Sequence, residues 1–284
     1  MLADVIGCLA CPHCGGELAL EERTAGCDAG HSFDIARQGY VSLLPGDAHT
    51  GTADTAAMVA AREAFLAAGH FEPLAGAIAA AVADALVDGS AGCAAEVGAG
   101  TGYYLARVLD ALPGRVGIAL DISRYALRRA ARAHPRMGAV ACDVWRGLPL
   151  RSGSVAALVN VFAPRNPAEF ARVLAPGGAL VIATPEPDHL AELVDALGLL
   201  DVEPGKAERL AEAFAVGFEH VRTVHVREPL PLTHADAAAL AAMGPSAHHA
   251  GPDTQRAHLA DLPEPVRTRL SVTVTAYRRS ARMR

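Results

Sequence analysis

Four potential metal ligands are concentrated in the first 31 residues of the chain. They form the pattern C-x2-C-x12-C-x3-H, with Cys11 and Cys14 in the first pair and Cys27 and His31 in the second. Cysteine thiolates and histidine nitrogens are the usual ligands of tetrahedral structural zinc, and such short spacings place each pair on one tight turn. The pattern therefore predicts a zinc ion held by all four residues in a small N-terminal zinc-binding domain.

A second choice of ligands exists, because Cys8 and Cys11 have the same spacing as Cys11 and Cys14. The later pair is preferred because it encloses Pro12 and is followed by Gly15, which suit a tight turn. Cys8 is then a spare thiol. The competing interpretation is that these are reduced surface thiols beside an unrelated histidine.

The composition excludes several classes of protein. No run of about 18 apolar residues occurs without charges or chain breakers, so no membrane span is predicted. The start of the chain, MLADVIGC, lacks a basic region followed by an apolar core, so no secretory signal is expected. Cys93 and Cys142 stand alone in apolar surroundings, which suits a reducing cytoplasm better than a disulfide scaffold. We therefore expect a cytoplasmic protein with no membrane partner.

The net charge of −6 does not indicate a nucleic-acid-binding protein, but the charge is unevenly distributed. The first 50 residues contain two arginines and seven acidic residues. Residues 122–136 contain five arginines and no acid, and residues 264–284 contain six arginines and one acid. A polyanion is expected to meet the two basic regions, because phosphate contacts dominate such binding. Ordinary solvated surfaces remain the alternative.

From Cys93 onward, short apolar segments alternate with helical patterns. The expected strands are 94–98, 115–121, 138–144, 155–162 and 178–185, and the expected helices between them are 103–112, 123–134 and 167–174. This alternation predicts an α/β fold with a parallel sheet and right-handed crossovers. Two later segments, 219–228 and 269–279, alternate with period two, as half-exposed strands do.

Three domains follow from this pattern. The zinc finger is expected at residues 1–45, a linker with N-terminal helices at 46–90, and the α/β domain at 91–284. Within the linker region, helices are expected at 56–68 and 73–87, and a further helix is expected near 234–243 in the last domain.

A glycine-rich loop between the first strand and helix of the α/β domain points to a cofactor site. Gly98, Gly100 and Gly102 alternate in EVGAGTG, where glycines let the backbone approach a ligand and the helix offers free N–H groups. A dinucleotide-binding loop would follow G-x-G-x-x-G, but its third glycine position is Tyr103. The dehydrogenase pattern therefore fails.

The pattern E-x-G-x-G-x-G, which begins at Glu96, resembles motif I of class I S-adenosylmethionine-dependent methyltransferases. The resemblance implies a Rossmann-like sheet of seven strands with the last antiparallel. It also implies that Asp121 accepts both ribose hydroxyls and that Asp143 faces the adenine amine. The implied cofactor is S-adenosylmethionine, held by Glu96, Gly98, Gly100, Gly102, Tyr103, Asp121 and Asp143.

Longer segments resemble one family within that class, the 23S rRNA (guanine-N1)-methyltransferases. They are the finger CPHC…CDAGHSFDIARQGYVSLLP, the segment DTAAMVAAREAFLAAGHFEPL, EVGAGTGYY and VFAP…ARVLAPGGALVIATPEPDHLAEL. The resemblance implies methyl transfer to N1 of a guanine in a hairpin loop of 23S rRNA domain II, which some family members use to confer macrolide resistance. The implied partner is 23S rRNA, and the finger is expected to help recognise it.

The loop after the fourth strand usually holds the target base in this class. Phe162 is expected to stack on the base, and Asn160 or Arg165 to bind its edge, so these three are the predicted catalytic residues. No Asp-Pro-Pro-Tyr signature is present, which disfavours methylation of an exocyclic amine. His70 and His189 lie in family-like segments and are expected to be structural or to contact phosphate.

Two other functions compete with rRNA methylation. A small-molecule methyltransferase, such as one that tailors an antibiotic, would share the cofactor site but would not need a zinc finger. A zinc-stabilised regulator that binds the cofactor without turnover would not need all the acidic residues beside the glycine loop. The sequence leaves the oligomeric state open, with a homodimer among the alternatives.

Overall fold

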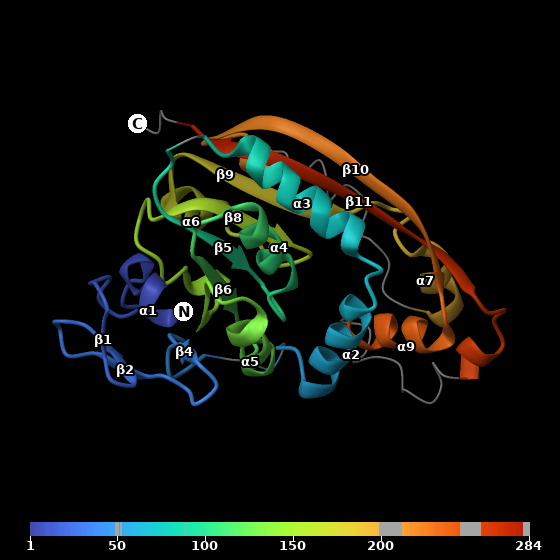
Figure 1. Cartoon of the computed structure of the whole chain (residues 1–284), viewed down its shortest axis with the longest axis horizontal. Helices are drawn as coiled ribbons and strands as arrows, with labels where there is room; N and C mark the ends of the chain where they lie inside the picture. Colours follow the sequence, from blue (N-terminus) through green and yellow to red (C-terminus); the bar gives the residue numbers. More distant parts are fainter. Residues whose placement is uncertain (49–50, 52, 88, 199–211, 245–256, 281–284) are drawn as a thin grey trace.

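The computed structural model describes residues 1–48, 51, 53–87, 89–198, 212–244 and 257–280. Its centre is an eight-stranded sheet with helices on both faces (Figure 1). From one edge to the other the strands are β10 (Phe218–Leu232), β11 (Val266–Arg279), β9 (Leu174–Pro185), β8 (Val155–Val161), β5 (Cys93–Val97), β6 (Gly117–Asp121), β7 (Met137–Ala141) and β4 (Tyr40–Ser42).

The strand directions confirm the predicted α/β sheet with its last strand antiparallel. The six strands from β9 to β4 are parallel, and β11 is antiparallel to both β9 and β10. The described sheet has eight strands instead of the predicted seven, because β4 pairs in parallel with β7. This extra strand comes from the N-terminal segment.

Helices cover the two faces of the sheet and divide its core in two. On one face lie α3 (Glu72–Ala85), α4 (Tyr103–Ala111), α5 (Arg124–Ala133) and α7 (Ala191–Leu197), together with α2 (Ala56–Ala67) and α9 (His234–Ala242). On the other face lie α1 (Leu2–Val5), α6 (Pro167–Val173) and the N-terminal ribbon. Because both faces are covered, β5, β7 and β8 are buried along their whole length.

The N-terminal segment forms a small ribbon that is joined to the main sheet. A three-stranded antiparallel sheet contains β1 (Ala19–Glu21), β2 (Thr24–Gly26) and β3 (Ser32–Asp34). Before it, α1 and the 3₁₀ helix η1 (Ile6–Cys8) pack on the main sheet, and Val5, Leu9 and Leu43 share one core cluster with its strands. The ribbon and the sheet therefore bury apolar surface together, and the boundary at residue 45 stays a prediction.

In the part of the chain that the structure describes, no single helix has the length and apolarity needed to cross a membrane. Helices α2 and α3 meet that criterion only as a pair, and the two are bent by 85° where they join.

Candidate functional site

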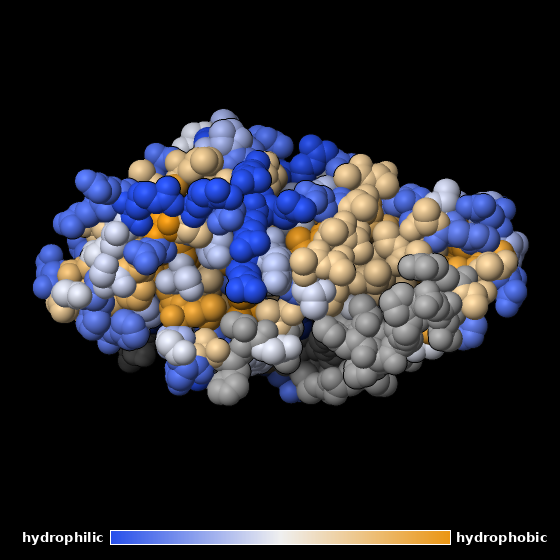
Figure 2. Space-filling model, turned by 90° about the horizontal axis from the view of Figure 1, so that it is seen from below, coloured by the Kyte–Doolittle hydropathy of each residue, from blue (hydrophilic) through white to orange (hydrophobic). Residues whose placement is uncertain are grey.

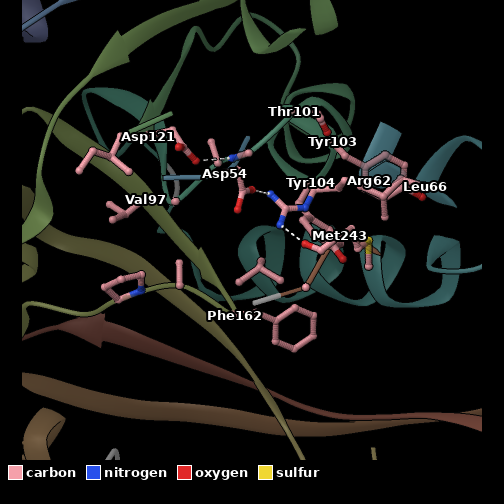
Figure 3. A pocket seen from close by; sticks show the side chains of 18 of the residues that line it. Asp54, Arg62, Leu66, Val97, Thr101, Tyr103, Tyr104, Asp121, Phe162 and Met243 are labelled. Atoms are coloured by element: carbon pink, nitrogen blue, oxygen red, sulfur yellow. Dashed lines mark hydrogen bonds and ion pairs between the residues drawn. The ribbon is translucent and has the colours of Figure 1, made fainter. Parts of the chain in front are cut away.

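A cleft of about 670 Å³ opens at the carboxyl ends of β5, β6, β7 and β8 (Figure 3). From β5 the chain first adds β6 and β7 on one side of β5. It then crosses to the other side and adds β8 and β9, so the strand order reverses between β5 and β8. Ligands of open α/β sheets bind at such a switch point. The cleft is lined by the glycine loop, the turns after β6 and β7, the loop after β8 and parts of α2 and α9.

The glycines of the loop have different tasks. Gly98 and Gly100 line the cleft, and all three have positive φ angles of 72°, 54° and 81° in chain order. A Cβ atom on Gly98 would lie 2.3 Å from the Cβ of Ala163, so this glycine lets the loop after β8 pass close to the cofactor loop. A Cβ on Gly102 would lie 2.9 Å from the Sδ of Met137. Gly102 therefore serves the packing of α4 on the sheet rather than ligand contact.

Asp121 lies at the end of β6, and its carboxylate accepts two hydrogen bonds from the protein backbone. Its Oδ2 accepts a hydrogen bond of 2.8 Å from the Gly100 N–H (Figure 3), and its Oδ1 accepts one of 2.7 Å from the Ser123 N–H. Burial raises the pKa of this carboxyl above its ordinary value. A carboxylate has about four acceptor sites, so roughly two remain for ribose hydroxyls. The residue fits the predicted role in the cofactor site.

Asp143 and Trp145 form the end of the cleft beside β7. The Oδ1 of Asp143 accepts a 3.0 Å hydrogen bond from the Trp145 N–H, and Asp143 thereby caps the start of the 3₁₀ helix η2 (Val144–Arg146). Trp145 is 68% exposed and lines the cleft, a position with no signal in the sequence pattern. An acid beside a flat, open aromatic ring suits the adenine that the resemblance places here.

Glu96 and Tyr103 support the cofactor loop in different ways. Glu96 is buried and does not line the cleft; its Oε2 accepts a 3.0 Å hydrogen bond from the Leu105 N–H in the first turn of α4. Burial raises the pKa of Glu96 well above its ordinary value. Glu96 is thus a positioning residue for α4 and not the predicted cofactor ligand. Tyr103 does line the cleft, and its hydroxyl donates to Glu72 at 3.1 Å.

Arg62 is a residue of the cleft that the sequence pattern did not reveal. It projects from α2, forms an ion pair with Asp54, and donates a 2.9 Å hydrogen bond to the carbonyl of Met243 (Figure 3). Its Nη1 atom lies 3.2 Å from the position that a Cβ on Gly100 would occupy. A guanidinium beside the glycine loop can bind the carboxylate of a methionine moiety, because its planar N–H groups match that shape.

The structure corrects the prediction that Asn160 and Arg165 bind the edge of the base. Asn160 is fully buried, and its Nδ2 donates to the carbonyls of Val97 at 3.2 Å and Pro164 at 3.0 Å. Its Oδ1 accepts a 3.1 Å hydrogen bond from the Nε of Arg165. Neither side chain lines the cleft. Their polar groups are used within the protein, so they act as positioning residues for the loop.

Phe162, in contrast, is open to the cleft and held in an unusual conformation. Its side chain is 42% exposed and its φ angle is 52°. Leu190, which also lines the cleft, has a φ angle of 58°. Among the described residues, Glu22 is the third non-glycine residue with positive φ. Strained backbone that the surrounding structure maintains is typical of functional sites, so the prediction that Phe162 meets the target base stays compatible with its position.

The four predicted metal ligands come together in the ribbon. One ligand atom from each of Cys11, Cys14, Cys27 and His31 lies within 4.8 Å of all the others. The Cys14 and Cys27 sulfurs are 3.7 Å apart, and the Nδ1 of His31 is 3.3 Å from the Cys27 sulfur. Ligands at about 2.1–2.3 Å from a tetrahedral zinc have such separations. Cys8 is not a member of this group. The donor set and its size fit zinc.

The arginine-rich segment 122–136 is only partly available to a ligand. Arg136 donates to the carbonyls of Leu109 and Leu112 at the end of α4, and Arg129 forms an ion pair with Glu63 at 3.0 Å. Arg124 and Arg128 lie over the ring of Tyr125, at 5.0 and 5.4 Å from its centroid. Strongly hydrophilic residues form a band across this face of the molecule (Figure 2). Arg282 and Arg284 lie outside the described residues.

Comparisons with known proteins agree with this geometry. Residues 9–50 match the zinc-ribbon family described as RlmA, N-terminal, and residues 95–182 match the family of methyltransferase domains. The predicted N-terminal zinc-binding unit and the class I methyltransferase domain are thereby confirmed.

Two relatives are similar over nearly their whole length. A protein of Micromonospora griseorubida assigned as a 23S rRNA (guanine-N(1)-)-methyltransferase is 51% identical, and 98% of this chain covers 99% of it. The 23S rRNA (guanine(748)-N(1))-methyltransferase of Streptomyces fradiae is 48% identical, with the same coverage. Among solved structures, the Haloferax volcanii complex of a methyltransferase with its activator Trm112 matches with a TM-score of 0.52 and 18% identity, covering 80% of this chain and 98% of that one. This last likeness concerns the fold alone.

Proposed function

The chain belongs to the family of 23S rRNA (guanine-N1)-methyltransferases, and from that membership we propose that it transfers a methyl group from S-adenosylmethionine to N1 of a guanine in 23S rRNA. The observation that carries this proposal is the combination of the zinc ribbon with a complete cofactor cleft in one chain. A small-molecule methyltransferase needs only the cleft. We place the target guanine in a hairpin loop of domain II and the enzyme in the cytoplasm. Methylation of this guanine would confer macrolide resistance.

The cleft residues divide into three groups with different tasks. Asp121 and Asp143 hold the nucleoside, and Arg62 holds the methionine carboxylate. Phe162 stacks on the guanine at the other end of the cleft. When bound, S-adenosylmethionine supplies an electrophilic methyl group on a sulfonium, and methyl transfer is an in-line displacement. Most of the rate enhancement therefore comes from holding the guanine at the correct distance and angle.

Incubation with labelled S-adenosylmethionine and a domain II hairpin transcript tests the proposal. We expect label in the RNA and a reverse-transcriptase stop at one loop guanine, because an N1 methyl group blocks the pairing edge. Hairpin binding should also weaken with salt, with a log–log slope of about −0.7 for each single-strand phosphate contact. Labelling of a small phenol or amine, with none in RNA, would reject the proposal in favour of the small-molecule function.

The role of Arg62 makes a separate prediction. Arg62→Gln should weaken S-adenosylmethionine binding by about ten-fold or more, since a charge-assisted hydrogen bond contributes about 1.5–3 kcal/mol. Decarboxylated S-adenosylmethionine, which lacks the carboxylate, should bind the variant and the wild type equally well in calorimetry. Arg129→Gln is the matched control, because Arg129 pairs with Glu63 outside the cleft. An equal loss with both ligands would show that Arg62 only holds the fold together.

A further inference from the structure

His189 lies in the turn after β9 and lines the cleft beside Phe162. The centroids of the two rings are 5.7 Å apart and the rings are inclined by 28°, and the centroid of the Phe71 ring lies 6.3 Å from that of His189. The strained residue Leu190 follows directly. The imidazole therefore stands at the end of the cleft where the target base is expected, and not on the surface that would contact phosphate.

Backbone hydrogen bonds fix this turn against β11. The Glu186 N–H donates to the Ser271 carbonyl at 2.9 Å, and the Leu190 N–H donates to the Arg269 carbonyl at 3.0 Å. Between these two bonds, the Ser271 N–H points at the Nδ1 of His189, 3.2 Å away. The imidazole nitrogen thus takes the place of a carbonyl as acceptor for a backbone donor.

This bond determines where the proton of the imidazole lies. A backbone N–H can only donate, so Nδ1 must carry its lone pair, and the proton of the neutral ring lies on Nε2. Protonation of both nitrogens, or a shift of the proton to Nδ1, would place an Nδ1–H donor opposite the Ser271 N–H donor and break this hydrogen bond. Within the described residues, Nε2 has no hydrogen-bond partner.

The surroundings keep the ring neutral. Burial lowers the pKa of His189 to about 4, although Asp188 and Glu186 act in the opposite direction. The effect of Glu186 is moderated because its carboxylate already accepts hydrogen bonds from Arg227, Ser271 and Thr273. Asp188 faces Arg269 of β11 at 3.8 Å. At neutral pH the side chain is therefore a fixed hydrogen-bond donor and a poor proton acceptor.

Building on the proposed function, we propose that the Nε2–H of His189 donates a hydrogen bond to O6 of the target guanine. The N1 proton leaves to solvent hydroxide, and the electron pair of the N–H bond spreads over N1, C6 and O6. The donor stabilises the negative charge that develops on O6. N1 then forms a bond to the methyl carbon while the carbon–sulfur bond breaks, and that electron pair remains on the sulfur.

Three variants distinguish this role from structural support. His189→Phe keeps an aromatic ring in the stack but removes the donor, and we expect kcat on the hairpin to fall about 10²–10³-fold, as after loss of one oxyanion donor. His189→Gln offers an amide oxygen to the Ser271 N–H and an amide N–H to O6. Its kcat should therefore be at least ten-fold higher than that of His189→Phe. His225→Gln is the control, because His225 binds Glu186 at the surface and lies outside the cleft.

Replacing one atom of the substrate locates the contact. The probe is a synthetic domain II hairpin with 6-thioguanine at the target, since sulfur is a weak acceptor, and inosine at the same place is the control. We expect 6-thioguanine to slow the wild type much more than His189→Phe, while inosine slows both equally. Equal effects of 6-thioguanine on both enzymes, or a glutamine variant no better than phenylalanine, would overturn the proposal. A wild type that methylates no hairpin guanine would instead reject the proposed function.

Discussion

Replacing Asp121 with alanine is expected to weaken S-adenosylmethionine binding by about 100-fold or more, because two charge-assisted hydrogen bonds of about 1.5–3 kcal/mol each are lost. The carboxylate keeps about two acceptor sites free after its bonds to the N–H groups of Gly100 and Ser123. Isothermal calorimetry with the full-length protein measures the effect directly.

The same residue predicts how binding depends on pH. Burial raises the pKa of Asp121, so this carboxyl takes up its proton at a higher pH than an ordinary aspartate does as the solution is acidified. A protonated carboxyl loses acceptor sites, so cofactor affinity should fall on acidification, and Asp121→Ala should lack this dependence. The control is Asp110→Ala, an exposed acid outside the cleft. Unchanged affinity in Asp121→Ala would show that the ribose lies elsewhere.

Loss of one zinc ligand is expected to unfold the ribbon. In Cys14→Ser, the zinc content should fall from one ion per chain toward zero, since apparent binding free energies of structural zinc are about 10–16 kcal/mol in finger peptides. The three short strands β1 to β3 bury few apolar side chains, chiefly Ala25 and Phe33, so they have little else to hold them. We expect methylation of the hairpin to be lost and cofactor binding to remain.

A point substitution tests the ribbon better than removal of residues 1–45. That deletion would also take away Val5 and Leu9, which are completely buried against the methyltransferase sheet, and the edge strand β4 of that sheet, with its buried Val41. Cys8→Ser is the matched control, because Cys8 lies outside the ligand group. Zinc retained at one ion per chain in Cys14→Ser, or absent from wild type purified without chelator, would contradict the predicted site.

Much of the site could be predicted because its signals are local. The spacing of Cys11, Cys14, Cys27 and His31 is a property of two short turns, which hold their geometry wherever the ribbon is placed. Asp121 and Asp143 could be assigned to one cleft because Asp121 ends one buried strand and Asp143 closely follows the next, and parallel strands bring their carboxyl ends to the same edge of the sheet. Such features depend on periodicity and short spacing alone.

Long-range packing sets which polar groups face the cleft and which form hydrogen bonds inside the protein. Asn160 and Arg165 lie in the correct loop, yet long-range partners turn their polar atoms inward and leave Phe162 at the site. Glu96 likewise belongs to the motif, but its carboxylate is directed toward α4. Side-chain direction follows from packing against distant segments, so it has no counterpart in local sequence.

The place of Arg62 in the cleft and the orientation of His189 became visible only in the structure for the same reason. Arg62 contacts Met243 across 181 positions of the chain, and His189 meets the Ser271 N–H across 82. The zinc ligands, the glycine loop and the acids near the strand ends could be identified from local sequence alone. The cleft lining, the tautomer of His189 and the eighth strand depended on where the folded chain brings distant segments together, because only there does each donor find its acceptor.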